Sequence, residues 1–157
     1  MRWGLCCQFR DIPIKYRSTT VAYIERLKTK TQNALQFLDK IILDNLDALL
    51  NTIIYCSEHQ IGCFRITSQL LPLYPHAQHG YQLEQLPSAA EIFQQFAHCQ
   101  KLAKEKKIRL SFHPDQFVVL NSPHPQIVHS SIQELEYHGT MAKLLGADVI
   151  NIHAGGV

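Results

Sequence analysis

Two short apolar segments of the chain each end in a histidine. Residues 108–112 run into His113 and Pro114, and residues 149–152 run into His153. Their apolar composition and the turn-forming residues around them predict β-strands. Parallel α/β folds place their functional groups at the carboxyl ends of strands, and neutral imidazole is the commonest side-chain ligand for metals. The two histidines therefore favour a fold whose parallel strands end at one shared edge.

Helical segments lie between the predicted strands. In residues 21–57 the apolar residues recur at spacings of three and four, and the length of this segment indicates two helices in tandem. Strands separated by helices of such length pair in parallel through right-handed crossovers. The sequence therefore predicts an α/β fold with about four parallel strands, at residues 2–7, 62–67, 108–112 and 148–153, and with further helices at residues 88–106 and 126–145.

Two helix boundaries carry capping signals. Ser88 is followed three residues later by Glu91, which predicts a capping box at the start of the second helical segment. Gly146 directly follows the last helical residue, which predicts a left-handed C-cap.

Composition excludes several classes of protein. No stretch approaches the roughly 18–20 apolar residues of a membrane span, and the start lacks a signal peptide, so a cytoplasmic location and no membrane partner are expected. The five cysteines form no Cys-x-x-Cys pair, which predicts reduced thiols. Alternation along the first strand predicts that Cys6 and Cys7 point to opposite sides, and packing of one or both in the core is their expected role. The net charge of +2 is compatible with a polyanionic partner but does not establish one.

The histidines at the ends of the strands are the best candidates for chemistry. His113 and His153 would meet on one rim of a parallel sheet, where they could share a metal ion. The alternative for any single histidine is an imidazole satisfied by a backbone carbonyl. Gln116 and Phe117 combine an amide that can bond to base edges with a ring that can stack on a base. The alternative is that Gln116 is an ordinary loop residue and Phe117 an aromatic residue of the core. His76 could reach the same rim.

Three ordered motifs together resemble the ultraviolet-damage endonucleases. They are Arg-Ile-Thr-Ser at residues 65–68 followed by His76, Ser-Phe-His-Pro-Asp-Gln-Phe at residues 111–117, and Asn-Ile-His-Ala-Gly-Gly at residues 151–156. The resemblance implies a TIM barrel related to the endonuclease IV group. It also implies an enzyme that nicks damaged double-stranded DNA on the 5′ side of photolesions with divalent metal ions, commonly manganese.

The resemblance also assigns roles to individual residues. It makes His113 and His153 metal ligands and His76 a catalytic histidine beside the metal centre. It makes Gln116 and Phe117 the pair that probes the duplex at the lesion, and it adds Gln8 as a DNA-binding candidate. Phe117 replaces a tyrosine of some members, so that stacking is retained and the hydroxyl is lost. Leu5 and Phe9 stand where some relatives carry tyrosine and asparagine, which argues against direct polar contacts there.

The number of strands indicates half of such a barrel. A TIM barrel has eight strands and typically about 250 residues, whereas residues 1–157 supply four strands, which is read as a single partial domain. We expect the isolated chain to be inactive, because the carboxylates of the family's metal cluster would come from later strands. A C-terminal half-barrel chain, or self-association through exposed sheet edges, is the expected partner. An abasic-site endonuclease, a sugar isomerase of the same superfamily and a non-catalytic fragment remain alternatives.

Overall fold

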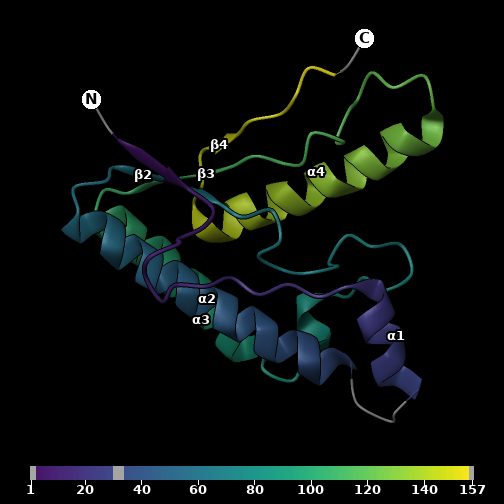
Figure 1. Ribbon diagram of the computed structural model, residues 1–157, viewed down its shortest axis with the longest axis horizontal. Helices are drawn as coiled ribbons and strands as arrows, with labels where there is room; N and C mark the ends of the chain where they lie inside the picture. The colour runs from purple at the N-terminus through teal and green to yellow at the C-terminus, as the bar shows by residue number, and fades with distance from the viewer. Residues whose placement is uncertain (1–2, 30–33, 156–157) are drawn as a thin grey trace.

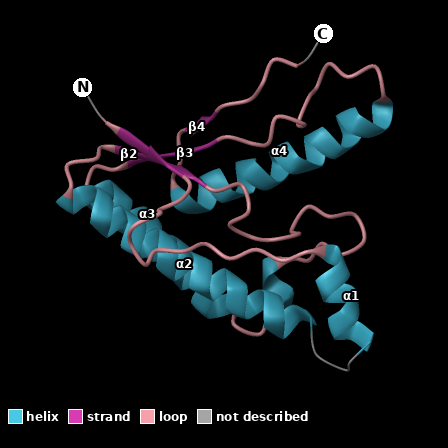
Figure 2. Cartoon of the chain, in the orientation of Figure 1, coloured by secondary structure: helices cyan, strands magenta, loops and turns pink. Residues whose placement is uncertain are grey.

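Strands and helices alternate along the chain (Figures 1 and 2). The computed structural model describes residues 3–29 and 34–155. A 3₁₀ helix in the loop after the second strand, η1, was not indicated by the sequence pattern. The tandem helices expected in residues 21–57 are confirmed. In chain order the elements are β1 (Gly4–Cys6), α1 (Val21–Thr29), α2 (Ala34–Glu58), β2 (Cys63–Ile66), η1 (Leu83–Gln85), α3 (Ala89–Glu105), β3 (Arg109–Phe112), α4 (Pro125–Leu145) and β4 (Val149–Ile150).

The four strands form one parallel sheet in the order β1-β2-β3-β4. In the register, Leu5 lies opposite Phe64, Phe64 opposite Leu110, and Phe112 opposite Ile150. The strand order follows the chain without the reversal of a doubly wound sheet, which is the arrangement of consecutive βα units in a barrel. The predicted fold class is confirmed.

The two faces of the sheet differ in burial. Phe64, Ile66, Leu110 and Phe112 point to the helices and are at most 2% exposed. The alternate residues of β2 and β3 face the other way and are half-buried or exposed. Figure 1 shows α2 and α3 together on one side of the sheet, and no helix of the described residues lies over the opposite face. The core is therefore a single layer between the sheet and its helices, and we call the uncovered side the open face.

A buried amide on α2 holds two loops against the core. Asn45 is fully buried; its Oδ1 accepts a hydrogen bond from the Arg17 backbone N–H at 2.6 Å. Its Nδ2 donates to the backbone carbonyls of Arg17 and Leu70, each at 2.9 Å. Buried amides are tolerated only when their hydrogen bonds are made, and here the loop before α1 and the loop after β2 supply them.

The predicted capping box at Ser88 is wrong, although the helix does begin at Ala89. Ser88 makes no side-chain cap bond. Instead its hydroxyl donates to Oδ2 of Asp39 and its backbone N–H donates to Oδ1, both at 2.9 Å. Asp39 is only 7% exposed, and a buried carboxylate is costly unless it accepts hydrogen bonds. The N–H groups of a helix terminus that is open to water can bond to water instead. The left-handed cap at Gly146 is confirmed, with φ of 68°.

The two outer strands are shorter than predicted. β1 ends at Cys6 because Cys7 has φ of 60°, which breaks the strand alternation, and Arg2 lies outside the described residues. Cys6 is exposed and Cys7 is half-buried, and neither belongs to the buried core, so the expectation that one or both pack there is wrong. β4 spans Val149–Ile150, and one more ladder bond joins the Asn151 N–H to the Phe112 carbonyl at 2.9 Å. His153 therefore lies in the segment after the strand.

His138, to which the sequence assigned no role, is a fully buried residue of α4. Its ring meets the ring of Phe112 edge-on at 5.6 Å, and its Nδ1 lies 2.8 Å from the carbonyl oxygen of Glu134. Its Nε2 is buried and has no hydrogen-bond partner among the described residues. Burial lowers the pKa of His138 from its ordinary value of 6.5, against the opposing effect of the Glu134 carbonyl.

Replacing Asn45 by alanine should lower the free energy of unfolding by about 2–4 kcal/mol, because the Arg17 and Leu70 backbone groups would lose their partner. Urea unfolding followed by circular dichroism measures the change. Asn51→Ala on the exposed side of the same helix is the matched control and should be close to neutral. Equal losses for the two variants would show that the buried amide has no special role.

The stability of the chain should fall as the pH decreases below about 6.5, since the unfolded chain binds a proton at His138 that the folded chain refuses. Above that pH the contribution of His138 is fully present. The slope below it should approach about 1.4 kcal/mol per pH unit for this one proton. Urea unfolding between pH 7.5 and 5.0 measures the slope, and His138→Gln should reduce it. The matched control is His98→Gln, at an exposed position of α3.

Candidate functional site

The structure brings His113 and His153 together. His113 directly follows β3, and His153 follows β4, the neighbouring strand. Their ring centroids are 4.8 Å apart, with the ring planes inclined at 59°. The predicted meeting of the two histidines at one edge of the sheet is confirmed, and we call them the histidine pair.

A close backbone contact joins the segments that carry the pair. Gly155 has φ of 109°, and a Cβ added to it would lie 1.8 Å from Oδ1 of Asn121. Only glycine combines this backbone conformation with so close an approach. The loop after β3 and the segment after β4 are thus packed against each other two residues beyond His153. Gly156, the second glycine of the motif, lies outside the described residues.

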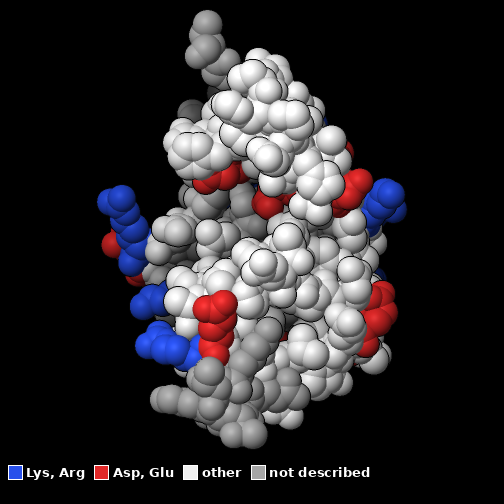
Figure 3. Space-filling model, turned by 90° about the vertical axis from the view of Figure 1, so that its right-hand side faces the viewer, with Lys and Arg blue, Asp and Glu red and all other residues white. Residues whose placement is uncertain are grey.

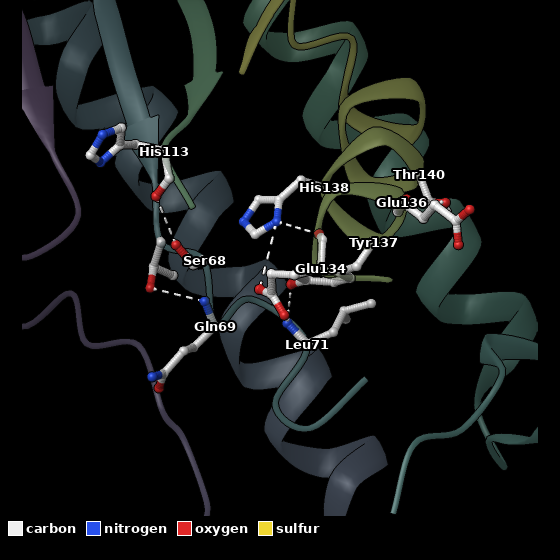
Figure 4. Close-up of polar contacts among 10 residues, drawn as sticks. Ser68, Gln69, Leu71, His113, Glu134, Glu136, Tyr137, His138 and Thr140 are labelled. Atoms are coloured by element: carbon white, nitrogen blue, oxygen red, sulfur yellow. Dashed lines mark hydrogen bonds and ion pairs between the residues drawn. The ribbon is translucent and has the colours of Figure 1, made fainter. Parts of the chain in front are cut away.

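The loop after β2 contacts the backbone of His113. The Ser68 hydroxyl donates to the backbone carbonyl of His113 at 3.0 Å (Figure 4). In the same view the His113 ring points away from His138, so the two histidines belong to different environments. The Ser68 bond fixes the backbone of His113, while its ring stays directed to the open face.

Arg65 adds a positive charge to the open face. Hydrogen bonding to the Cys7 thiol raises the pKa of Arg65, and its Nε is buried without a hydrogen-bond partner among the described residues. Burial lowers the pKa of His113, and the charges of Arg65 and then His153 lower it further. A lowered pKa keeps imidazole neutral, which is the form that binds metal ions.

His76 lies in a different environment from the pair. It lines a pocket of about 500 Å³ that also includes Ser68 and Glu134. Its Nδ1 accepts from the backbone N–H groups of Gln78 and His79, each at 3.2 Å. Within residues 3–29 and 34–155, no three His, Cys, Asp or Glu side chains are grouped so that they could hold a metal ion. The structure therefore does not add His76 to the histidine pair as a third ligand.

Gln116 and Phe117 form the tip of the loop after β3. Both are exposed, and Phe117 is 76% exposed, so the alternative of a core aromatic is wrong. Gln8 is exposed just beyond the carboxyl end of β1, where its N–H donates to the Cys6 carbonyl at 2.8 Å. All three residues therefore lie at the carboxyl ends of strands, as do the histidines. Their roles in binding DNA stay predictions.

Sequence reasoning gave no role to several residues of the site. Arg65 could have been found, because strand alternation places it on the face opposite the buried Phe64 and Ile66. Ser68 and Asn121 act through contacts with the backbone of distant residues, and no sequence pattern indicates such contacts.

Charged side chains form no continuous basic surface on the side of the molecule seen in Figure 3. Lys and Arg lie at the margins of this face, and several Asp and Glu side chains lie farther inside it, between largely uncharged surfaces. This distribution agrees with the modest net charge of +2. Any contact of this side with a polyanion would depend on individual side chains.

Known proteins resemble the chain along nearly all of its length. The family model described as UV-endonuclease UvdE matches residues 2–157. A UV DNA damage endonuclease of Nostoc sp. is 31% identical over 160 residues, covering 97% of this chain and 47% of that protein. A UV-damage endonuclease of Neurospora crassa is 32% identical over 128 residues, covering 77% of this chain and 19% of that protein. The crystal structure of SacUVDE matches with a TM-score of 0.80 and 29% identity, covering 99% of this chain and 50% of that one.

These matches confirm the resemblance drawn from the three motifs. The chain spans about half the length of the Nostoc relative and of SacUVDE, in agreement with the four strands observed. The family model covers all the motif residues, including both members of the histidine pair. The chain belongs to the UV-endonuclease UvdE family.

Proposed function

We propose that this chain provides one half of a divalent-metal site that nicks DNA on the 5′ side of ultraviolet photolesions. The observation that carries the proposal is the histidine pair, with ring centroids 4.8 Å apart at the carboxyl edge of a parallel sheet. Family membership supports it, because the matched relatives are named as endonucleases of ultraviolet damage.

The donor set fits part of a metal site. Two neighbouring imidazoles suit two ligand positions of one divalent ion, for which we propose Mn²⁺. The lowered pKa of His113 favours the neutral imidazole, which is the form that binds metal ions. A bound divalent ion would polarise a phosphodiester oxygen for hydrolysis. Hard ions also require oxygen ligands, and no carboxylate joins the pair among the described residues. We therefore propose that the chain alone is inactive and needs a second half-barrel. His76 would act beside the completed centre.

Phe117 and Gln116 supply the contact with DNA in this proposal. An exposed aromatic ring can stack on a base whose neighbours are poorly stacked, as at a photolesion, and an adjacent amide can bond to a base edge. Gln8 would contact the DNA from the end of β1. The same exposed ring argues against a sugar isomerase, whose small substrate offers no base to stack on.

A non-catalytic role as an assembly fragment is the second candidate. It is favoured by the open face, over which no helix of the described residues lies. A second sheet, from another chain or another copy, would cover this face and pair with the sheet edges.

The cytoplasm is the proposed compartment. All five cysteines are free thiols, as expected under reducing conditions. Across the described part of the chain, no helix has both the length and the apolar character that crossing a bilayer requires.

The proposed function is tested by nicking of plasmid DNA in the presence of Mn²⁺. The chain alone should not nick irradiated plasmid. Mixed with a separately produced remaining half of the Nostoc relative, it should nick irradiated plasmid and leave undamaged plasmid intact. His113→Ala or His153→Ala should lower the rate in the mixture at least about a hundredfold. Mutating even the residues that hydrogen-bond to metal ligands typically lowers metal affinity or activity about 10 to 100-fold.

His124→Ala, at an exposed position before α4, is the control and should retain the rate. Robust nicking by the chain alone would contradict the need for a second half. A mixture that cuts abasic plasmid but not irradiated plasmid would favour the abasic-site alternative. A mixture that assembles by light scattering but cuts neither would favour the non-catalytic role.

Replacing Gly155 by alanine should separate the histidine pair. The added Cβ would overlap Asn121, and φ of 109° is strained for any residue with a side chain. The nuclear Overhauser contacts between the His113 and His153 rings should weaken or vanish, while the helical circular dichroism stays. Gly139→Ala is the matched control, since nothing lies within 4 Å of a Cβ added there. Unchanged ring contacts in Gly155→Ala would show that the loop contact does not position His153.

A further inference from the structure

The tip of the loop after β3 is a short exposed segment between two buried anchors. Pro114 and Val118 are buried, and the three residues between them are exposed. Phe117, a large apolar side chain, is 76% exposed within this segment. Burial would favour a phenylalanine ring, so its exposure here depends on the conformation of the segment that carries it.

Asp115 makes the hydrogen bonds that shape this tip. Its Oδ1 accepts from the backbone N–H of Phe117 at 3.0 Å, and its carbonyl accepts from the N–H of Val118 at 3.0 Å. The first bond is a side-chain mimic of a backbone turn, and the second closes a β-turn with Gln116 and Phe117 at its centre. The segment from Asp115 to Val118 is called the Asp115 turn below.

The Asp115 turn is also tied to a helix. The N–H of Val119, the residue after the turn, donates to the Ser131 hydroxyl at 3.0 Å. Ser131 belongs to α4 and is 3% exposed, so this anchor sits on the folded core. The turn is therefore fixed by its own bonds at the tip and by α4 at its base.

We propose that Asp115 is a positioning residue that holds the Phe117 ring ready to stack, and thereby sets the preference for damaged over intact DNA. This inference rests on the proposed function. A ring on a free loop must lose conformational freedom when it stacks, whereas a ring already held outward has little left to lose. A fixed ring fits a site where stacking is already weakened, and it cannot rearrange to suit an intact stack.

Charge supports the acceptor role of Asp115. An exposed carboxylate on a surface that meets DNA repels phosphates, so it is unfavourable for binding unless it has another purpose. The charge of Asp115 acts on His113, where it opposes the lowering of the pKa by burial, and on Glu134, where it adds to the raising of the pKa by burial. Neither donates a hydrogen bond to it, which leaves the turn bond to Phe117 as the contact that explains an acid here.

The test compares Asp115→Ala with Asp115→Asn in the 157-residue chain mixed with the remaining half of the Nostoc relative. Asparagine keeps the Oδ1 acceptor and loses the charge, while alanine loses both. The readouts are the ratio of the dissociation constants for undamaged and irradiated duplexes at one salt concentration, and hydrogen exchange of the Phe117 amide. Asp115→Ala should lower the ratio about fivefold, which corresponds to roughly 1 kcal/mol. Asp115→Asn should keep the ratio and bind both duplexes more tightly.

Ser122→Ala is the matched control, because Ser122 accepts from the His124 N–H at 3.2 Å in a similar local turn of the same loop. It should change neither readout. If the wild-type mixture prefers irradiated DNA and the Asp115→Ala mixture keeps the full preference, the inference is overturned and the proposed function stands. If the wild-type mixture shows no preference, the proposed function fails. The exchange rate then decides whether Asp115 holds Phe117, and an unchanged rate in Asp115→Ala overturns the inference.

Discussion

The parallel register between β2 and β3 is the constraint on which the rest of this structure depends. Phe64 lies opposite Leu110 and Ile66 opposite Phe112, and all four side chains are buried against the helices. Because side chains alternate along a strand, a shift of β3 by one residue would turn Leu110 and Phe112 to the open face. The same shift would turn His113 into the core. The burial of four apolar side chains therefore decides where the site histidine points.

Local patterns predicted what depends on local forces. The strand and helix order followed from apolar spacing, and the cap at Gly146 followed from the backbone freedom of one residue. The prediction at Ser88 was wrong because Asp39, forty-nine residues earlier, competes for the same serine. Tertiary hydrogen bonds of this kind override local propensity, and one sequence alone does not show them.

In the candidate site, too, some residues were predicted from the sequence and others were not. His113, His153, Gln116 and Phe117 were found because motifs preserve chemical groups at fixed spacings, and the structure places them at the carboxyl ends of strands. The groups that support them were missed. Asn121 lies against the backbone of Gly155, and the Ser68 hydroxyl bonds to the backbone of His113. Such contacts depend on the path of the folded chain, which no local sequence pattern indicates. The sequence therefore predicts the reactive side chains of a site far better than the residues that hold them in place.

The amide of Asn45 has a further consequence for the motions of the protein. It bonds at the same time to the loop before α1 and to the loop after β2, through Arg17 and Leu70. If either loop leaves the core, the Asn45 amide that also binds the other loop becomes exposed. The two loops should therefore open as one cooperative unit, with a common rate and a common free energy, although they are far apart in the sequence. Since the loop after β2 carries Ser68, the support of His113 belongs to that unit as well.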